Sequence, residues 1–223
     1  GLRRLRRCGG VSPMSRARAR RRRLNLRFAA LCLMAIFLLA GAVIWLAAGR
    51  GLPAEGVEVP DYVRQDLLTV NPWSRPGTPL EEIRGVVIHY VGNPGTTAQN
   101  NRDFFDKDET EVSSHFVVGL KGEIIQCLPL WERSAASNNR NKDTISIEVC
   151  HPDGTGKFND ATYTSVVKLT AWLLKETGLS GDNVIRHYDV TGKLCPIYYV
   201  NNPDKWEAFK KDVKTSLAEL KEK

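Results

Sequence analysis

Residues 85–92 read GVVIHYVG, an apolar run that ends at His89 and leads into a loop rich in glycine and proline. A short apolar run bounded by turn residues is typical of a buried strand. A second segment, residues 184–196, reads VIRHYDVTGKLCP, which predicts a short strand that runs into a polar loop. It carries His187, Lys193 and Cys195. Because functional residues gather at strand ends and in loops, we expect the two segments to form one site.

His89, His187 and Cys195 are three residues of metal-ligand type without a fourth. A closed structural zinc site needs four protein ligands, whereas three leave a position open for water, as in catalytic zinc sites. The alternative is that these residues are unrelated, because a lone buried cysteine usually behaves as a small apolar side chain. Spacing alone does not decide between the two interpretations.

The body of the chain alternates predicted strands and helices. Thr96 and Thr97 can cap a helix that runs to about Asp106, with Phe104 and Phe105 facing inward. The other predicted elements are strands over 114–120, 123–128, 144–150 and 184–188, and helices from Thr164 and over 204–223. The first two strands are joined by a Lys-Gly hairpin signal, and both helices show the 3.6-residue apolar period. The pattern predicts an α/β fold with a central mixed β-sheet flanked by helices.

Five short motifs occur in a recognisable order between Leu67 and Trp206. They are SRPG at 74–77, VIHY at 87–90, SSHFVV at 113–118, SIEV at 146–149, and RHYDV at 186–190 with KLCP at 193–196. In these motifs the chain resembles the type 2 family of zinc-dependent N-acetylmuramoyl-L-alanine amidases, which are relatives of the peptidoglycan recognition proteins. The resemblance implies the same α/β fold and a Zn²⁺ ion bound by His89, His187 and Cys195. It also implies a peptidoglycan hydrolase that cleaves the amide bond between N-acetylmuramic acid and L-alanine of the stem peptide by zinc-activated water. We expect such an enzyme to act as a monomer.

Glu148 and Lys193 are the predicted catalytic residues. Glu148 interrupts the apolar strand predicted over 144–150, and an unpaired charge buried there would cost several kcal/mol, so a cation or a water-filled cleft is expected beside it. The resemblance implies that Glu148 activates the zinc-bound water, since Ser114 stands where other members have a tyrosine. It also implies that Lys193 donates to the oxyanion. The alternatives are a structural ion pair for Glu148 and a solvated loop lysine for Lys193.

Two other functions remain open. A peptidoglycan-binding module without catalysis would share the fold, although the non-enzymatic recognition proteins characteristically lack the cysteine ligand and Cys195 is present. A zinc peptidase that cuts within the stem peptide would use the same centre. The sequence contains no His-Glu-x-x-His helix, which argues against the common zincins.

Several further polar residues have less definite roles. His115 is predicted to be a core histidine that points away from the cleft, and His151 to be a residue that could line the substrate groove. Asp189 could support His187 or Lys193. Whether Cys127 and Cys150 form a disulfide cannot be decided from the sequence.

The first 62 residues predict an anchor rather than part of the domain. Residues 1–27 hold eleven arginines and no acidic residue, and residues 28–49 hold no charge. We expect a cytoplasmic Arg-rich tail, then a transmembrane helix, since about 20 apolar residues suffice to cross a bilayer. Residues 50–62 are interpreted as a stalk and 63–223 as the catalytic domain. The expected location is the cell membrane, single-pass, with the domain extracytoplasmic.

The net charge of +7 comes from this basic tail. Without the eleven arginines and Arg50, the chain has 20 basic and 25 acidic residues, a net charge of −5. Nucleic-acid binding by the arginine run is a second interpretation, but the apolar segment that follows favours a topology signal, and we expect no nucleic-acid partner. Cleavage of the segment as a signal peptide would instead give a secreted protein. Met14 is a possible true start.

Overall fold

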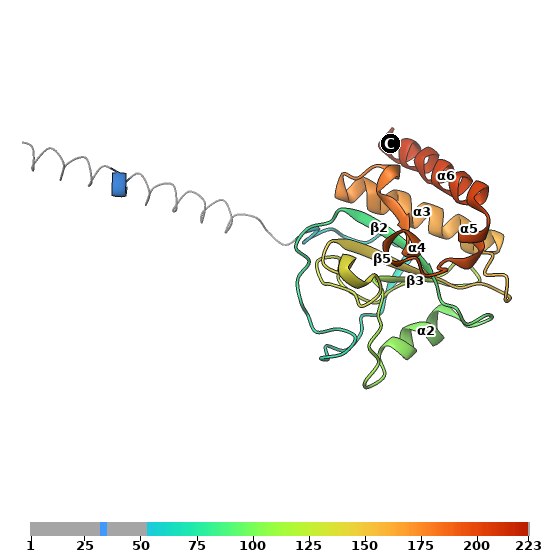
Figure 1. The fold of residues 1–223 in the computed structure, drawn as a ribbon, viewed down its shortest axis with the longest axis horizontal. Helices are drawn as coiled ribbons and strands as arrows, with labels where there is room; N and C mark the ends of the chain where they lie inside the picture. Colours follow the sequence, from blue (N-terminus) through green and yellow to red (C-terminus); the bar gives the residue numbers. More distant parts are fainter. Residues whose placement is uncertain (1–31, 35–52, 223) are drawn as a thin grey trace, which may run out of the picture. The chain divides into compact units, whose positions relative to one another are not determined.

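The strand that carries His89, β2 (Gly85–Tyr90), lies between β5 (Thr144–Val149) and β6 (Val184–Arg186) and runs parallel to both (Figure 1). This arrangement comes from a computed structural model that describes residues 32–34 and 53–222. The described sheet has six strands in the order β1-β4-β3-β5-β2-β6. Its other strands are β1 (Val63–Gln65), β3 (Phe116–Val118) and β4 (Ile124–Gln126). Because β3 and β4 are antiparallel while the other neighbours are parallel, the predicted mixed sheet is confirmed.

Helices cover both faces of the sheet (Figure 1). The long helices α3 (Asp160–Thr177) and α6 (Pro203–Lys221) pack together on one side, and α2 (Ala98–Phe105) lies on the other. Two short helices, α4 (His187–Thr191) and α5 (Ile197–Asn201), follow β6. Single 3-10 turns lie at Asn138–Arg140 and Gly181–Asn183. The predicted α/β fold with flanking helices is therefore confirmed for the described residues.

The period-2 alternation of the central strands separates an apolar face from a polar one. On β5, Ile145, Ile147 and Val149 join the apolar core under α3 and α6. Ser146 and Glu148 alternate with them and therefore point to the face on the α2 side. His89 lies on that same face of β2, since its neighbour Ile88 belongs to the α3 core. The sheet thus holds a histidine and a glutamate side by side, away from the main apolar core.

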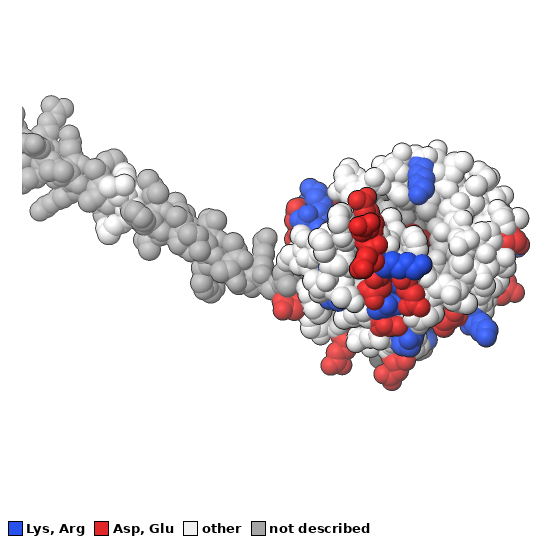
Figure 2. All heavy atoms as spheres, turned by 90° about the horizontal axis from the view of Figure 1, so that it is seen from below, with Lys and Arg blue, Asp and Glu red and all other residues white. Residues whose placement is uncertain are grey.

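The outward surface of α2 is charged. Arg102 pairs with Asp66 at 3.1 Å and with Asp106 at 2.7 Å. Figure 2 shows the molecule from below, where acidic and basic side chains gather in one band and the surface beside it is largely uncharged. These pairs are partly exposed, so we expect a solvated surface with modest effect on stability.

Several predicted boundaries and one orientation are wrong, and the strands predicted over 114–120 and 123–128 are both shorter in the structure. Helix α3 begins at Asp160 rather than Thr164, because Asn159 caps it by accepting the Thr162 N–H. Strand β6 ends at Arg186 rather than Tyr188, because His187 begins α4. The Phe104 side chain is 48% exposed, while Phe105 is buried as predicted. A helix of eight residues has a narrow buried face, and two consecutive residues cannot both occupy its centre.

The predicted membrane location is also wrong. No helix in residues 32–34 and 53–222 is long and apolar enough to cross a membrane. Most of the predicted span, 28–49, lies outside the described residues, as do the predicted tail over 1–27 and the first residues of the stalk. An apolar run of sufficient length is only one requirement for a span. Apolar composition alone does not establish a span.

Candidate metal centre

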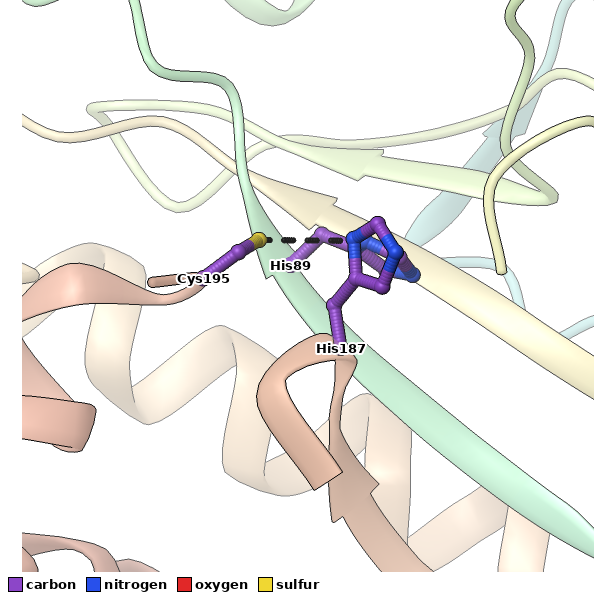
Figure 3. Close-up of side chains that lie close together, drawn as sticks. All are labelled: His89, His187 and Cys195. Carbon is purple, nitrogen blue, oxygen red and sulfur yellow. Dashed lines mark hydrogen bonds between the residues drawn. The ribbon is translucent and has the colours of Figure 1, made fainter. Parts of the chain in front are cut away.

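The side chains of His89, His187 and Cys195 converge from three different elements (Figure 3). His89 lies near the end of β2, His187 is the first residue of α4, and Cys195 lies in the loop between α4 and α5. One potential ligand atom from each residue lies within 4.8 Å of the other two. All three residues are buried. The cluster lies at the carboxyl ends of β2 and β6, which is where ligands bind in parallel sheets.

The two histidine rings are oriented by residues at the start of the 3-10 turn. His89 Nε2 lies 3.1 Å from Ser137 Oγ, and His187 Nε2 lies 3.0 Å from Asn138 Oδ1. Both contacts fit a proton on Nε2, which leaves the lone pair of Nδ1 on each ring. Asn141 fixes this loop in turn, because its Oδ1 accepts the Ser137 N–H at 2.6 Å.

Cys195 contacts the two elements that carry the histidines, α4 and β2. Its carbonyl accepts the N–H of Tyr188 at 2.9 Å, which ties the cysteine loop to the start of α4. Its Sγ lies 3.9 Å from His89 Nδ1. The two contacts hold the thiol beside the ring nitrogen that the Ser137 contact leaves free.

The pKa values of the three residues are shifted by burial and by neighbouring charges. Burial lowers the pKa of His89 well below its usual value, and the charges of His187 and Lys193 act in the same direction. Burial and then Lys193 also lower the pKa of His187. Burial, followed by the charge of Glu148, raises the pKa of the Cys195 thiol to about 12. The imidazoles are therefore neutral and ready to bind a metal, whereas the thiol loses its proton only when a cation is bound.

These properties fit a divalent metal of borderline softness. Two neutral imidazoles and one thiol are the ligand types that zinc prefers, and three of them leave a coordination position open. The described residues bring together the three ligands predicted from the sequence and add no fourth His, Cys, Asp or Glu to the cluster.

Glu148 lies next to the cluster in a cavity of about 270 Å³. Its Oε1 is 3.9 Å from His89 Nδ1, and its side chain is 18% exposed. Its Oε2 is buried and has no hydrogen-bond partner among the described residues. Burial raises the pKa of Glu148 to about 8, against the opposing charge of Lys193. A buried carboxyl without a partner is costly, which is the environment expected where a catalytic group meets a ligand.

Lys193 and several apolar side chains complete the lining of this cavity. Lys193 is exposed at the rim, and Phe104 and Val112 are the partly exposed apolar residues on the α2 side. The exposed Phe104 is therefore part of the cavity wall. One side of the cavity is therefore polar and carries the cation of Lys193, and the other side is apolar.

The other polar residues singled out in the sequence lie elsewhere. His115 is a buried core histidine, as predicted: Nδ1 accepts the Ser146 N–H at 3.0 Å and Nε2 donates to the Glu132 carbonyl at 2.8 Å. Ser114 donates to the Ser146 carbonyl inside the core. His151 is buried against Tyr90 and is absent from the lining of the cavity.

Asp189 and the two remaining buried cysteines do not support the centre. Asp189 pairs with Arg186 at 2.7 Å and caps α4, rather than contacting His187 or Lys193. Cys127 and Cys150 are both buried free thiols. Ser137 and Asn138, which do contact the histidines, were missed. Ser137 precedes the 3-10 turn and Asn138 begins it, and each is separated from its histidine by 48 or 49 residues of sequence. No local sequence pattern connects residues so far apart.

Sequence comparison now identifies the family. A family profile described as N-acetylmuramoyl-L-alanine amidase matches residues 79–197, the segment that contains both histidines, Glu148 and Cys195. The chain belongs to this amidase family. The amidase CwlL of Bacillus licheniformis is 31% identical over 172 residues, covering 70% of this chain and 47% of that protein. The amidase BlyA of Bacillus subtilis strain 168 is 32% identical, covering 68% and 46%. This amidase-family chain thus spans about half the length of the curated relatives it matches.

Solved structures of the family share the fold. The catalytic domain of XlyA has a TM-score of 0.59 and 29% identity, covering 68% of this chain and 98% of that one. A mutant endolysin from Bacillus subtilis gives 0.60 and 28%, covering 68% and 97%. The aligned 68% of the present chain therefore corresponds to nearly the whole of each of these two solved chains.

Proposed function

We propose that this protein is a peptidoglycan hydrolase that cleaves the amide bond between N-acetylmuramic acid and L-alanine. The observation that carries the proposal is one cavity that holds His89, His187 and Cys195 together with Glu148, whose Oε2 has no hydrogen-bond partner among the described residues. Membership of the amidase family and the names of its relatives support the choice of substrate.

His89, His187 and Cys195 would hold Zn²⁺. When bound, zinc lowers the pKa of a coordinated water toward about 7 and polarises the carbonyl of the bond to be cleaved. The hydrogen bonds that the two rings donate to Ser137 and Asn138 fix them so that each presents Nδ1. Hydrogen bonds of this kind set both the tautomer and the orientation of histidine ligands.

Glu148 would act as the general base and then as the general acid. Its carboxylate takes a proton from the attacking water and returns it to the nitrogen of the leaving L-alanine. A pKa raised by burial suits both halves of this transfer, because a group that titrates near the working pH can accept and release a proton. The free Oε2 leaves room for the proton inside the cavity.

Lys193 would stabilise the charge that develops on the carbonyl oxygen. It lies at the rim of the cavity, and its positive charge acts on the pKa values of His89, His187 and Glu148. An ammonium group already in place needs no reorganisation as the carbonyl oxygen becomes negative. The Phe104 and Val112 side would meet the less polar part of the substrate.

A digest of purified peptidoglycan by the full chain tests the proposal. We expect stem peptides with a free L-alanine amine, detected by mass spectrometry, and no new reducing sugar ends. A well-equilibrated chelator should abolish release and added Zn²⁺ should restore it. Cleavage within the stem peptide would identify a peptidase instead, and binding without any cleavage would identify a recognition module.

A further inference from the structure

A second cavity of about 450 Å³ adjoins the metal centre. It lies beside the first: Ala135 lines both cavities, and Asn138, which lines the second, accepts a hydrogen bond at Oδ1 from His187 of the first. Trp73, which is 46% exposed, lines this cavity. A substrate that extends from the metal centre into this cavity would reach the indole ring.

Trp73 is displayed on a rigid turn. Asn71 Oδ1 accepts the N–H groups of Trp73 at 2.9 Å and Ser74 at 2.8 Å, and the Asn71 N–H donates to the Arg75 carbonyl at 2.9 Å. Arg75 in turn makes two 2.8 Å bonds to Glu132, with both side chains largely buried. The backbone that carries this exposed ring is therefore fixed, which reduces the conformational entropy lost when the ring contacts a ligand.

The same turn is tied directly to the wall that the two cavities share. Ser113 Oγ donates to the Ser74 carbonyl at 2.6 Å and accepts the Ala135 N–H at 3.0 Å. The position of Trp73 relative to the metal centre is therefore fixed through one serine.

The charges and polar groups of the second cavity suit a neutral, hydroxyl-rich ligand. Its two cations share one carboxylate: Arg133 lies 3.0 Å and Lys142 3.6 Å from Glu81. The exposed Asn139 side chain makes no hydrogen bond within the described part of the chain, so its amide is free to donate and accept. An apolar ring face beside free amide groups matches a sugar, whose C–H face stacks on indole while its hydroxyl and acetamido groups form hydrogen bonds.

We propose that this second cavity binds an N-acetylated sugar of the glycan strand next to the one whose amide is cleaved. The proposal rests on the proposed function for the choice of polymer. The stem peptide, which carries carboxylates, is the less suitable occupant because the nearby cations are already partly neutralised by Glu81.

Equilibrium binding to the full chain tests this subsite without requiring catalysis. The probes are peptide-free glycan strands of alternating N-acetylglucosamine and N-acetylmuramic acid, and the free tetrapeptide stem. In isothermal titration, Trp73→Ala should weaken glycan binding about tenfold, as expected for the loss of a stacked aromatic contact, and Trp73→Phe should recover part of it. Asn139→Ala should weaken it severalfold. The matched control is Tyr62→Ala, an exposed aromatic that lies against Lys168 of α3.

Three results would overturn the subsite: no measurable glycan binding by the wild type, equal binding by the Trp73→Ala variant, or loss of stem-peptide binding rather than glycan binding in that variant. The wall digest separates this proposal from the proposed function. If L-alanine amines are released but glycan binding does not depend on Trp73, only the subsite proposal is wrong. If glycan binding depends on Trp73 but no amines are released, the amidase proposal is wrong and the glycan-binding site remains.

Discussion

Glu148 lies opposite His89 in the register of the parallel strands β5 and β2, with its Oε1 3.9 Å from Nδ1 of the histidine. Both side chains leave the sheet on the face away from the α3 and α6 core. Two adjacent strands therefore fix the separation between a proposed metal ligand and the proposed base. A rigid pair of this kind needs no movement of the backbone for proton transfer beside the ligand.

The Glu148→Gln variant should fold and bind zinc but lose about 10²–10⁴ in kcat, the range that general acid–base groups contribute. Glutamine keeps the shape of the side chain and removes its basicity. Release of L-alanine amines from purified wall measures the rate, and Glu219→Gln, an exposed change on α6, is the control. Near-normal turnover would show that Glu148 has a structural role.

The Lys193→Met variant should lose about 10²–10³ in kcat, as expected when one donor to a developing oxyanion is removed. Methionine keeps much of the length and apolar stem of lysine. Lys193→Arg should recover part of the rate because the charge is retained. An equal loss in Lys211→Met, an exposed lysine on α6, would point to a general effect of surface charge instead.

The strands and helices of this domain could be predicted from local patterns, but some of their ends could not. Apolar runs identified β2 and β5, and the 3.6-residue period identified α3 and α6. The start of α3 was placed too late because Asn159, rather than a later residue, provides the cap. Asp189 was assigned to the wrong partner because its bond to Arg186 depends on the turn from β6 into α4.

The site was predictable to the extent that its residue types are distinctive. Histidines at or just after the ends of two strands, with a cysteine in the loop that follows, indicated a metal centre, and the structure places the three side chains together. Ser137 and Asn138 could not be found in this way. Serine and asparagine are common in loops, and their contacts to the histidines depend on the packing of a loop against two distant strands.

Ser137→Ala and Asn138→Ala should each weaken zinc binding about 10–100-fold, as is typical when a hydrogen bond to a histidine ligand is removed. The affinity can be measured by competition with a chromophoric chelator, independently of activity. Asn139→Ala is the adjacent control, because its side chain contacts neither histidine. If both variants bind zinc as tightly as wild type, the two residues do not orient the ligands.

The buried His115 should make the folded protein less stable in acid. Burial lowers its pKa to about 4, because protonation would place a charge in the core and remove the bond that Nδ1 accepts from the Ser146 N–H. The unfolded chain, with a pKa near 6.5, takes up the proton first as the pH falls. The contribution is therefore fully present above about pH 6.5 and lost toward pH 4, a change of about 3 kcal/mol in the free energy of unfolding.

Urea unfolding of metal-free protein between pH 7.5 and pH 4 would measure this loss. His89 and His187 act in the same direction, and Glu148, whose pKa burial raises to about 8, acts in the opposite one. His115→Gln is therefore needed to isolate the effect: its unfolding free energy should lose the contribution of His115 to the pH dependence seen in the wild type. Where that variant folds poorly, the ring signals of His115 in the wild type can be followed by NMR. A ring that titrates near pH 6.5 in the folded protein would contradict the prediction, since it would show that the core accepts the charge without cost.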